Sequence, residues 1–180
     1  QEEYEAASVI LQQLNAALFI MAGNRDNREV LRVAFANHLP DNCHPEFIQY
    51  MTELEGNCLL MLDTISNESN KGRLCDERLT HLAGMLDQAD GKPVTIFMHH
   101  PTFEITASRY PFQFEDGADA FAAVVGRYPN VGSVRCGHTH RQATGDVAGI
   151  AALTIPSIAE DLRRGDAVGP EVIAPVLQLA

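Results

Sequence analysis

The first 35 residues show apolar positions at helical spacing, interrupted by one short apolar run. Residues 3–14 carry a stripe along one helical face, formed by Tyr4, Ala7, Leu11 and Leu14. This stripe predicts a helix, and the uninterrupted apolar run at 18–22, which ends at Gly23, predicts a strand. A second helix is expected after Asn27, whose side chain can cap it. The apolar face of that helix would consist of Val30, Leu31, Ala34 and Phe35.

Short apolar runs alternate with helical patterns along the rest of the chain. The runs that predict strands lie at 58–62, 94–98, 131–136, 150–155 and 172–179. Helical spacing predicts helices at 76–89 and 118–128. Such alternation is typical of α/β layering. Because 180 residues with 46% hydrophobic content can bury a substantial core, we expect residues 1–180 to form a single domain.

Three polar clusters stand where apolar runs end. They are Gly23-Asn24-Arg25-Asp26, His99-His100-Pro101 and Gly137-His138-Thr139-His140. Asn24 offers a carboxamide oxygen, and the imidazoles offer nitrogens suited to Zn, Mn, Fe or Co. Each cluster alone also occurs in ordinary loops, but ligands of α/β sheets gather at strand ends. The conjunction of the three clusters therefore predicts a metal site.

The residues within these clusters add two expectations. His138 and His140 are two positions apart, so on an extended segment their rings would point to opposite sides. Gly23 and Gly137 lack a Cβ where the chain must turn sharply or approach an ion closely. The spacing of the two histidines favours two neighbouring metals over one.

Together the three clusters resemble the successive metal-site motifs of the calcineurin-like metallophosphoesterases, which read Gly-Asn-His-Asp, His-x-Pro and Gly-His-x-His. Residues 71–77, 94–101 and 127–138 resemble the branch that holds glycerophosphodiesterases and class III cyclic-nucleotide phosphodiesterases. The resemblance covers roughly residues 1–160. It implies an α/β sandwich of two sheets flanked by helices, and hydrolysis of phosphodiesters that depends on two metals.

The resemblance also implies a ligand set, which this sequence matches only in part. Asn24, His99 and His138 correspond to ligands of the second metal, and His140 to a ligand of the first. No Asp-x-His or Gly-Asp-x-x-Asp precedes Asn24, and Asp63 and Gly165-Asp166 lie at the wrong place in the chain order. The bridging carboxylate is therefore missing. We expect a truncated domain that lacks the first two strands and holds one weakly bound metal or none, unless a partner chain supplies carboxylates.

Other positions depart from the family pattern. Arg25 replaces a histidine that contacts the phosphate and protonates the leaving oxygen; it could clamp phosphate oxygens instead, or merely pair with Asp26. His100 is predicted to lie beside the ligands and to contact substrate. Residues 159–161 stand where many relatives place a histidine near the substrate. The aromatic loop at 103–117 either covers the pocket and stacks on a base, or serves local packing or a dimer contact.

Composition narrows the partners. The chain has 24 acidic and 13 basic residues, a net charge of −11, which disfavours binding to a nucleic-acid polymer. A small phosphodiester substrate is compatible with this charge only where a metal inverts the local field. The four cysteines form no Cys-x-x-Cys pair and no membrane span is evident, so we expect a cytoplasmic location and no membrane partner. Exposed sheet edges would permit a homo-oligomer.

Two functions remain open from the sequence. The first is a metal-dependent phosphodiesterase acting on a cyclic nucleotide or a glycerophosphodiester-like substrate, complete only in a full-length form. The alternative is a degenerate, non-catalytic module for binding or dimerisation.

Overall fold

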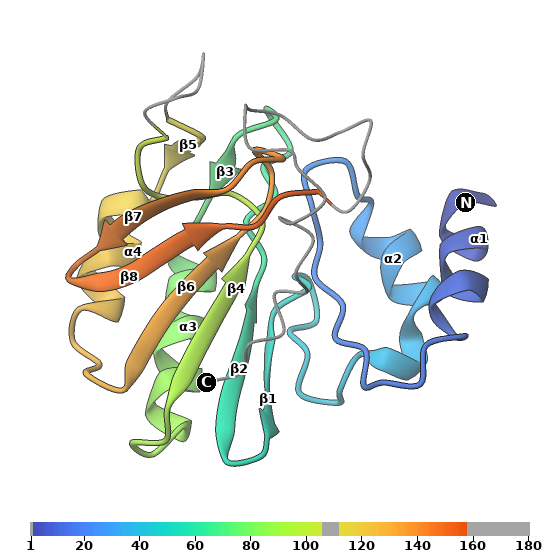
Figure 1. The fold of residues 1–180 in the computed structure, drawn as a ribbon, viewed down its shortest axis with the longest axis horizontal. Helices are drawn as coiled ribbons and strands as arrows, with labels where there is room; N and C mark the ends of the chain where they lie inside the picture. Colours follow the sequence, from blue (N-terminus) through green and yellow to red (C-terminus); the bar gives the residue numbers. More distant parts are fainter. Residues whose placement is uncertain (1, 106–111, 158–180) are drawn as a thin grey trace.

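A six-stranded sheet organises the computed structural model, which describes residues 2–105 and 112–157. The strands are ordered β1-β2-β4-β6-β8-β7. The four inner strands are parallel, and β1 and β7 run antiparallel at the edges (Figure 1). The bounds are Tyr50–Leu54 for β1, Asn57–Leu62 for β2, Val94–Met98 for β4, Val131–Cys136 for β6, Ala143–Val147 for β7 and Ile150–Thr154 for β8. The carboxyl ends of the inner strands therefore meet at one edge of the sheet.

Two helices cover one face of this sheet (Figure 1). They are α3 (Asp76–Gln88) and α4 (Ala118–Val125). The predicted inward positions Leu79, Leu82 and Leu86 of α3 are buried in one core with strand residues such as Ile96. In α4, Phe121 and Val125 are buried. The helix ends before the predicted residue 128, because the chain leaves it at Gly126, three residues before Pro129.

The amino-terminal segment packs against the opposite face, over β1 and β2. It contains α1 (Glu2–Leu11), α2 (Arg28–Ala34) and the short 3₁₀ helix η1 (Ala36–His38). The Asn27 side chain accepts a hydrogen bond from the Val30 N–H, which confirms the predicted cap of α2. Leu31 and Phe35 join a second core with Tyr50 and Met61, while Val30 and Ala34 are only partly buried.

The predicted strand at 18–22 is wrong. These residues form no ladder with any strand in the described part of the chain, although Ile20 and Ala22 are buried. The Tyr50 hydroxyl replaces a neighbouring strand: it accepts from the Ile20 N–H and donates to the Ile20 carbonyl, each at 2.9 Å. Burial of an apolar run therefore does not require that it pair in a sheet.

A small second sheet lies near the carboxyl ends of the main strands. It pairs β3 (Gly72–Arg73) with β5 (Phe114–Asp116) in parallel. The predicted strands at 58–62, 94–98, 131–136 and 150–155 are confirmed to within one residue, whereas β1, β3, β5 and β7 were not predicted. The strand predicted at 172–179, the positions 159–161 and Gly165-Asp166 lie outside the described residues. Among the helices described, none is long and apolar enough to cross a bilayer.

A buried carboxylate ties α2 and α3 to the end of β2. Asp63, with no exposed surface, accepts two hydrogen bonds of 2.8 Å from Arg28 and one from each of the Ile48 and Ile65 amides. Arg78 lies 3.6 Å away, and both guanidinium groups stack on Phe47. Asp63, whose place in the chain order does not fit a metal ligand of the family pattern, therefore uses its carboxylate in hydrogen bonds and ion pairs that join α2, α3 and β2.

Candidate metal centre

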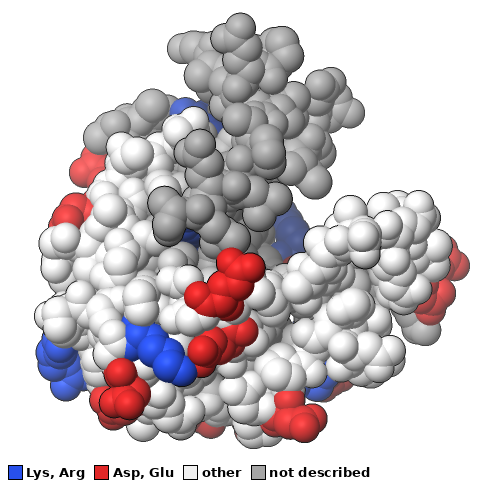
Figure 2. All heavy atoms as spheres, turned by 60° about the horizontal axis from the view of Figure 1, so that its bottom comes forward, with Lys and Arg blue, Asp and Glu red and all other residues white. Residues whose placement is uncertain are grey.

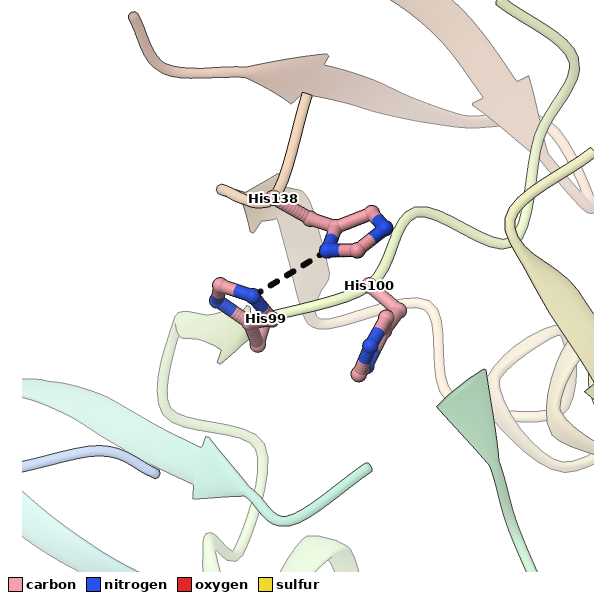
Figure 3. Close-up of side chains that lie close together, drawn as sticks. All are labelled: His99, His100 and His138. Carbon is pink, nitrogen blue, oxygen red and sulfur yellow. Dashed lines mark hydrogen bonds between the residues drawn. The ribbon is translucent and has the colours of Figure 1, made fainter. Parts of the chain in front are cut away.

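Donor atoms from three separate segments converge at the carboxyl edge of the main sheet. His99 directly follows β4, His138 follows the neighbouring β6, and Asn24 lies in the loop before α2. His99 Nε2 lies 2.9 Å from Asn24 Oδ1. The same nitrogen lies 3.2 Å from His138 Nδ1 (Figure 3). β4 and β6 end level, with Met98 opposite Cys136, so the two histidines leave the sheet side by side. The structure thus brings three of the four predicted ligands together.

The Gly23 backbone passes close to the His99 ring. A Cβ at this position would lie 3.1 Å from both Nδ1 and Cε1 of His99. The Gly137 N–H donates to the His99 carbonyl at 3.0 Å, which extends the β4–β6 pairing by one residue. The Gly23 backbone thus lies close to the His99 ring, whereas a Cβ at Gly137 would meet that ring only at ordinary contact distance, 3.5 Å from Nδ1.

Burial keeps these imidazoles uncharged. It lowers the pKa of His99 to about 4, helped by repulsion from His138 and His140. The pKa of His138 is also lowered, first by burial and then by His140. Both rings are therefore neutral at pH 7, which is the form that ligates metals. In the metal-free chain His99 Nε2 carries the proton, because Asn24 Oδ1 only accepts, so a metal bound at Nε2 requires this proton to move to Nδ1.

His140 is placed differently from the prediction. The segment after β6 is bent rather than extended, because His138 and His140 both adopt left-handed backbone angles, with φ of 65° and 56°. In the part of the chain that is described, the clustered imidazoles are His99, His100 and His138, with candidate ligand atoms all within 4.8 Å. His140 stays outside this group, and its buried Nδ1 has no hydrogen-bond partner among residues 2–105 and 112–157. Strained backbone of this kind is common at functional sites.

His100 lies within the imidazole cluster, but its ring nitrogens are not available to ligate a metal. It is fully buried; Nε2 lies 3.1 Å from the Asn70 carbonyl, which can only accept, and Nδ1 lies 2.8 Å from the Thr64 hydroxyl. Nε2 therefore carries the proton and Nδ1 accepts from Thr64. Both ring nitrogens of His100 are hydrogen-bonded and the residue has no exposed surface. No atom of the ring is therefore accessible for the substrate contact predicted from the sequence. His100 instead packs beside His99 and His138, with ring centroids 4.8 and 4.5 Å away.

The sequence of the chain is similar to those of known phosphodiesterases. The chain is 30% identical over 175 residues to the glycerophosphodiester phosphodiesterase GpdQ of Enterobacter lignolyticus, covering 90% of the chain and 61% of that protein. It is 31% identical over 153 residues to a probable cyclic nucleotide phosphodiesterase of Rhodopseudomonas palustris, covering 82% of the chain and 54% of that protein. The chain is therefore similar in sequence to proteins named as glycerophosphodiester and cyclic nucleotide phosphodiesterases.

Structural comparison supports the metallophosphoesterase-like fold. A dimetal phosphatase from Danio rerio superposes with a TM-score of 0.60 at 17% identity, over 77% of this chain and 60% of that one.

A further sequence relative shows how much of such proteins the chain covers. A probable glycerophosphodiester phosphodiesterase GpdQ of Arcobacter nitrofigilis is 29% identical over 181 residues, which cover 97% of this chain but 65% of that protein. The chain thus spans less than two thirds of these relatives. No family model matches it.

The loop that carries Asn24 is held by the amino-terminal helix α1. The Asp26 carboxylate accepts from the Gly23 N–H at 2.7 Å and from the Tyr4 hydroxyl of α1 at 2.9 Å. The Tyr4 oxygen accepts in turn from the Asn27 N–H at 2.8 Å. Arg25 is exposed and forms no ion pair with Asp26 or any other described residue. Arg25 therefore does not pair with Asp26, which was one of the two alternatives that the sequence left open.

Two residues near the centre carried no sequence signal. Gln113 contacts His138, and Thr64 contacts His100, yet neither belongs to a recognisable motif. Gln113 falls within the aromatic loop at 103–117, of which 106–111 lie outside the described residues. Phe103 and Phe114 of this loop are buried. Local packing, one of the alternatives for the loop, accounts for these two rings.

Proposed function

We propose that Asn24, His99 and His138 form half of the metal site of a phosphodiesterase, complete only in a form that also supplies carboxylates. The observation that carries this proposal is the convergence of three donor atoms. Asn24 Oδ1 lies 2.9 Å from His99 Nε2, and His138 Nδ1 lies 3.2 Å from the same nitrogen. An amide oxygen and two neutral imidazoles fit a divalent transition metal such as Mn, Fe, Zn or Co. His140 Nδ1, which is buried with no hydrogen bond to any described residue, is available as a ligand of a second metal.

We expect the isolated chain to bind one metal, not two. The imidazole cluster includes no Asp or Glu within the described ranges, and the sequence before Asn24 lacks the family's carboxylate motifs. When present, paired metals stabilise the charge of a phosphoryl group and lower the pKa of water. The residues of this chain would bind the metal, while an exposed Arg25 would hold the phosphate oxygens.

The proposed substrate is a small phosphodiester, of the cyclic nucleotide or glycerophosphodiester type named for the relatives. Acidic and basic groups are both scattered over the face shown in Figure 2, most of which belongs to uncharged residues. With a net charge of −11, the chain is poorly suited to hold the phosphate backbone of a nucleic-acid polymer.

Hydrolysis of bis-p-nitrophenyl phosphate with saturating Mn²⁺ tests the function. A version extended upstream by about 60 residues to include Asp-x-His and Gly-Asp-x-x-Asp motifs should turn over the ester, while the present chain should be far slower. The matched control is the extended version with His99→Ala. If the extended protein binds metal but shows no turnover, the degenerate binding or dimerisation module becomes the better description.

Arg25 should contribute to substrate binding but not to proton transfer. In the extended protein, we expect Arg25→Ala to raise KM because the phosphate loses a bidentate donor. Arg25→His should raise kcat, because an imidazole can protonate the leaving oxygen, an effect typically worth about 10²–10⁴ in rate. Steady-state kinetics on the two variants would measure both effects, with the exposed Arg127→Ala as control. An unchanged kcat in Arg25→His would contradict this assignment.

A further inference from the structure

Gln113 bonds to the side of His138 that faces away from the metal centre. Gln113 Oε1 lies 3.0 Å from His138 Nε2. A carboxamide oxygen only accepts hydrogen bonds, so Nε2 of the neutral ring must carry the proton. The lone pair is then left on Nδ1, the atom that lies 3.2 Å from His99 Nε2. Gln113 therefore selects the tautomer in which His138 can act as a ligand through Nδ1.

The small β3–β5 sheet fixes the place of Gln113. Gln113 immediately precedes β5, and its carbonyl accepts from the Gly72 N–H of β3 at 2.9 Å. Gly72 is required for this approach, because a Cβ there would collide with the ring of Phe114 and with Cβ of His100. Gln113 as a residue is only 9% exposed, which limits competition by water for its hydrogen bond to His138. A backbone anchor and a buried side chain together make a rigid support.

We infer that Gln113 is a positioning residue that holds His138 in the Nε2–H tautomer with Nδ1 directed at the metal. Partners of this kind on the outer nitrogen of a ligating histidine fix its orientation and raise its basicity. The inference rests on the proposed function for its metal, but the tautomer is a property of the metal-free chain. It gives the β3–β5 sheet, which the sequence did not predict, a role in the site.

Three variants separate this role from a general effect on folding. Gln113→Leu removes the acceptor at similar volume, and Gln113→Glu keeps an acceptor at the same place. Gln88→Leu, at the exposed end of α3, makes the same chemical change away from the site. Circular dichroism would show which variants retain the wild-type fold.

The first readout is the His138 tautomer in the metal-free chain. Long-range ¹H–¹⁵N spectra at pH 8, with the His138 signals assigned from their loss in His138→Gln, should show Nε2–H in the wild type. Gln113→Glu and Gln88→Leu should keep this tautomer, and Gln113→Leu should give a mixture. A pure Nε2–H tautomer in folded Gln113→Leu, or Nδ1–H in the wild type, would overturn the inference.

The second readout is affinity for Co²⁺ or Mn²⁺ by calorimetry. Gln113→Leu should bind about 10–100-fold more weakly than the wild type, while Gln113→Glu binds at least as tightly. If Gln113→Leu does not fold, Gln113→Glu still decides, because weaker binding by that variant would contradict an acceptor role. If the wild type binds no metal, the proposed function is contradicted instead. The tautomer spectra of the metal-free chain would still show whether Gln113 fixes the His138 tautomer.

Discussion

Replacing His99 with alanine is expected to abolish the metal binding proposed for Asn24, His99 and His138. His99 Nε2 is the atom that both other donors approach, Asn24 Oδ1 at 2.9 Å and His138 Nδ1 at 3.2 Å. Loss of this central ligand should reduce affinity by more than the ~10–100-fold typical of changes outside the ligand shell. Calorimetric titration with Mn²⁺ or Zn²⁺ would measure the effect.

The matched control is His38→Ala, since His38 lies in η1 and contacts Phe35 rather than the site. We expect His38→Ala to bind metal as the wild type does. If His99→Ala folded normally and bound metal with unchanged affinity, the metal would have to lie elsewhere, and the assignment of Asn24 and His138 would fall with it.

Replacing Asp63 with alanine is expected to lower the free energy of unfolding by about 3–5 kcal/mol, the range for breaking a buried ion pair from one side. The carboxylate has no exposed surface and binds Arg28 through two 2.8 Å hydrogen bonds. Without it, Arg28 and the buried Arg78 would face each other over Phe47 with no counter-charge. Urea denaturation followed by circular dichroism would give the difference.

Asp41→Ala is the control for this change, because Asp41 is exposed. It should alter stability by less than about 0.5 kcal/mol. Asp63 also precedes Thr64, whose hydroxyl lies 2.8 Å from His100 Nδ1, so the destabilised variant should bind metal more weakly as well. A loss below about 1 kcal/mol would show that the ion pair is not the anchor described here.

Periodicity predicted most of the parallel core, since buried inner strands such as β2 and β4 are continuous apolar runs. It did not predict β1 or β7, which lie at the sheet edges and mix polar with apolar positions. It also predicted a strand at 18–22, where the Tyr50 hydroxyl satisfies the Ile20 backbone instead. An apolar run in the sequence indicates that a segment is buried. It does not indicate which group forms hydrogen bonds with the backbone of that segment.

The proximity of the candidate ligands was predictable where a motif stands at a strand end. Asn24, His99 and His138 meet as expected because β4 and β6 end side by side. The place of His140 was not predictable, because its position depends on two left-handed residues in the turn. Gln113 reaches His138 only through the pairing of β3 with β5, a contact between segments about 40 residues apart that no local pattern encodes.

Elemental analysis after metal loading tests the central claim most directly. The chain would be saturated with Mn²⁺ or Zn²⁺, dialysed and measured beside His99→Ala. We predict about one metal per wild-type chain and none in the variant, because three neutral donors converge without a bridging carboxylate. No metal retained by the wild type, or equal amounts in both proteins, would contradict the claim that Asn24, His99 and His138 form a metal site.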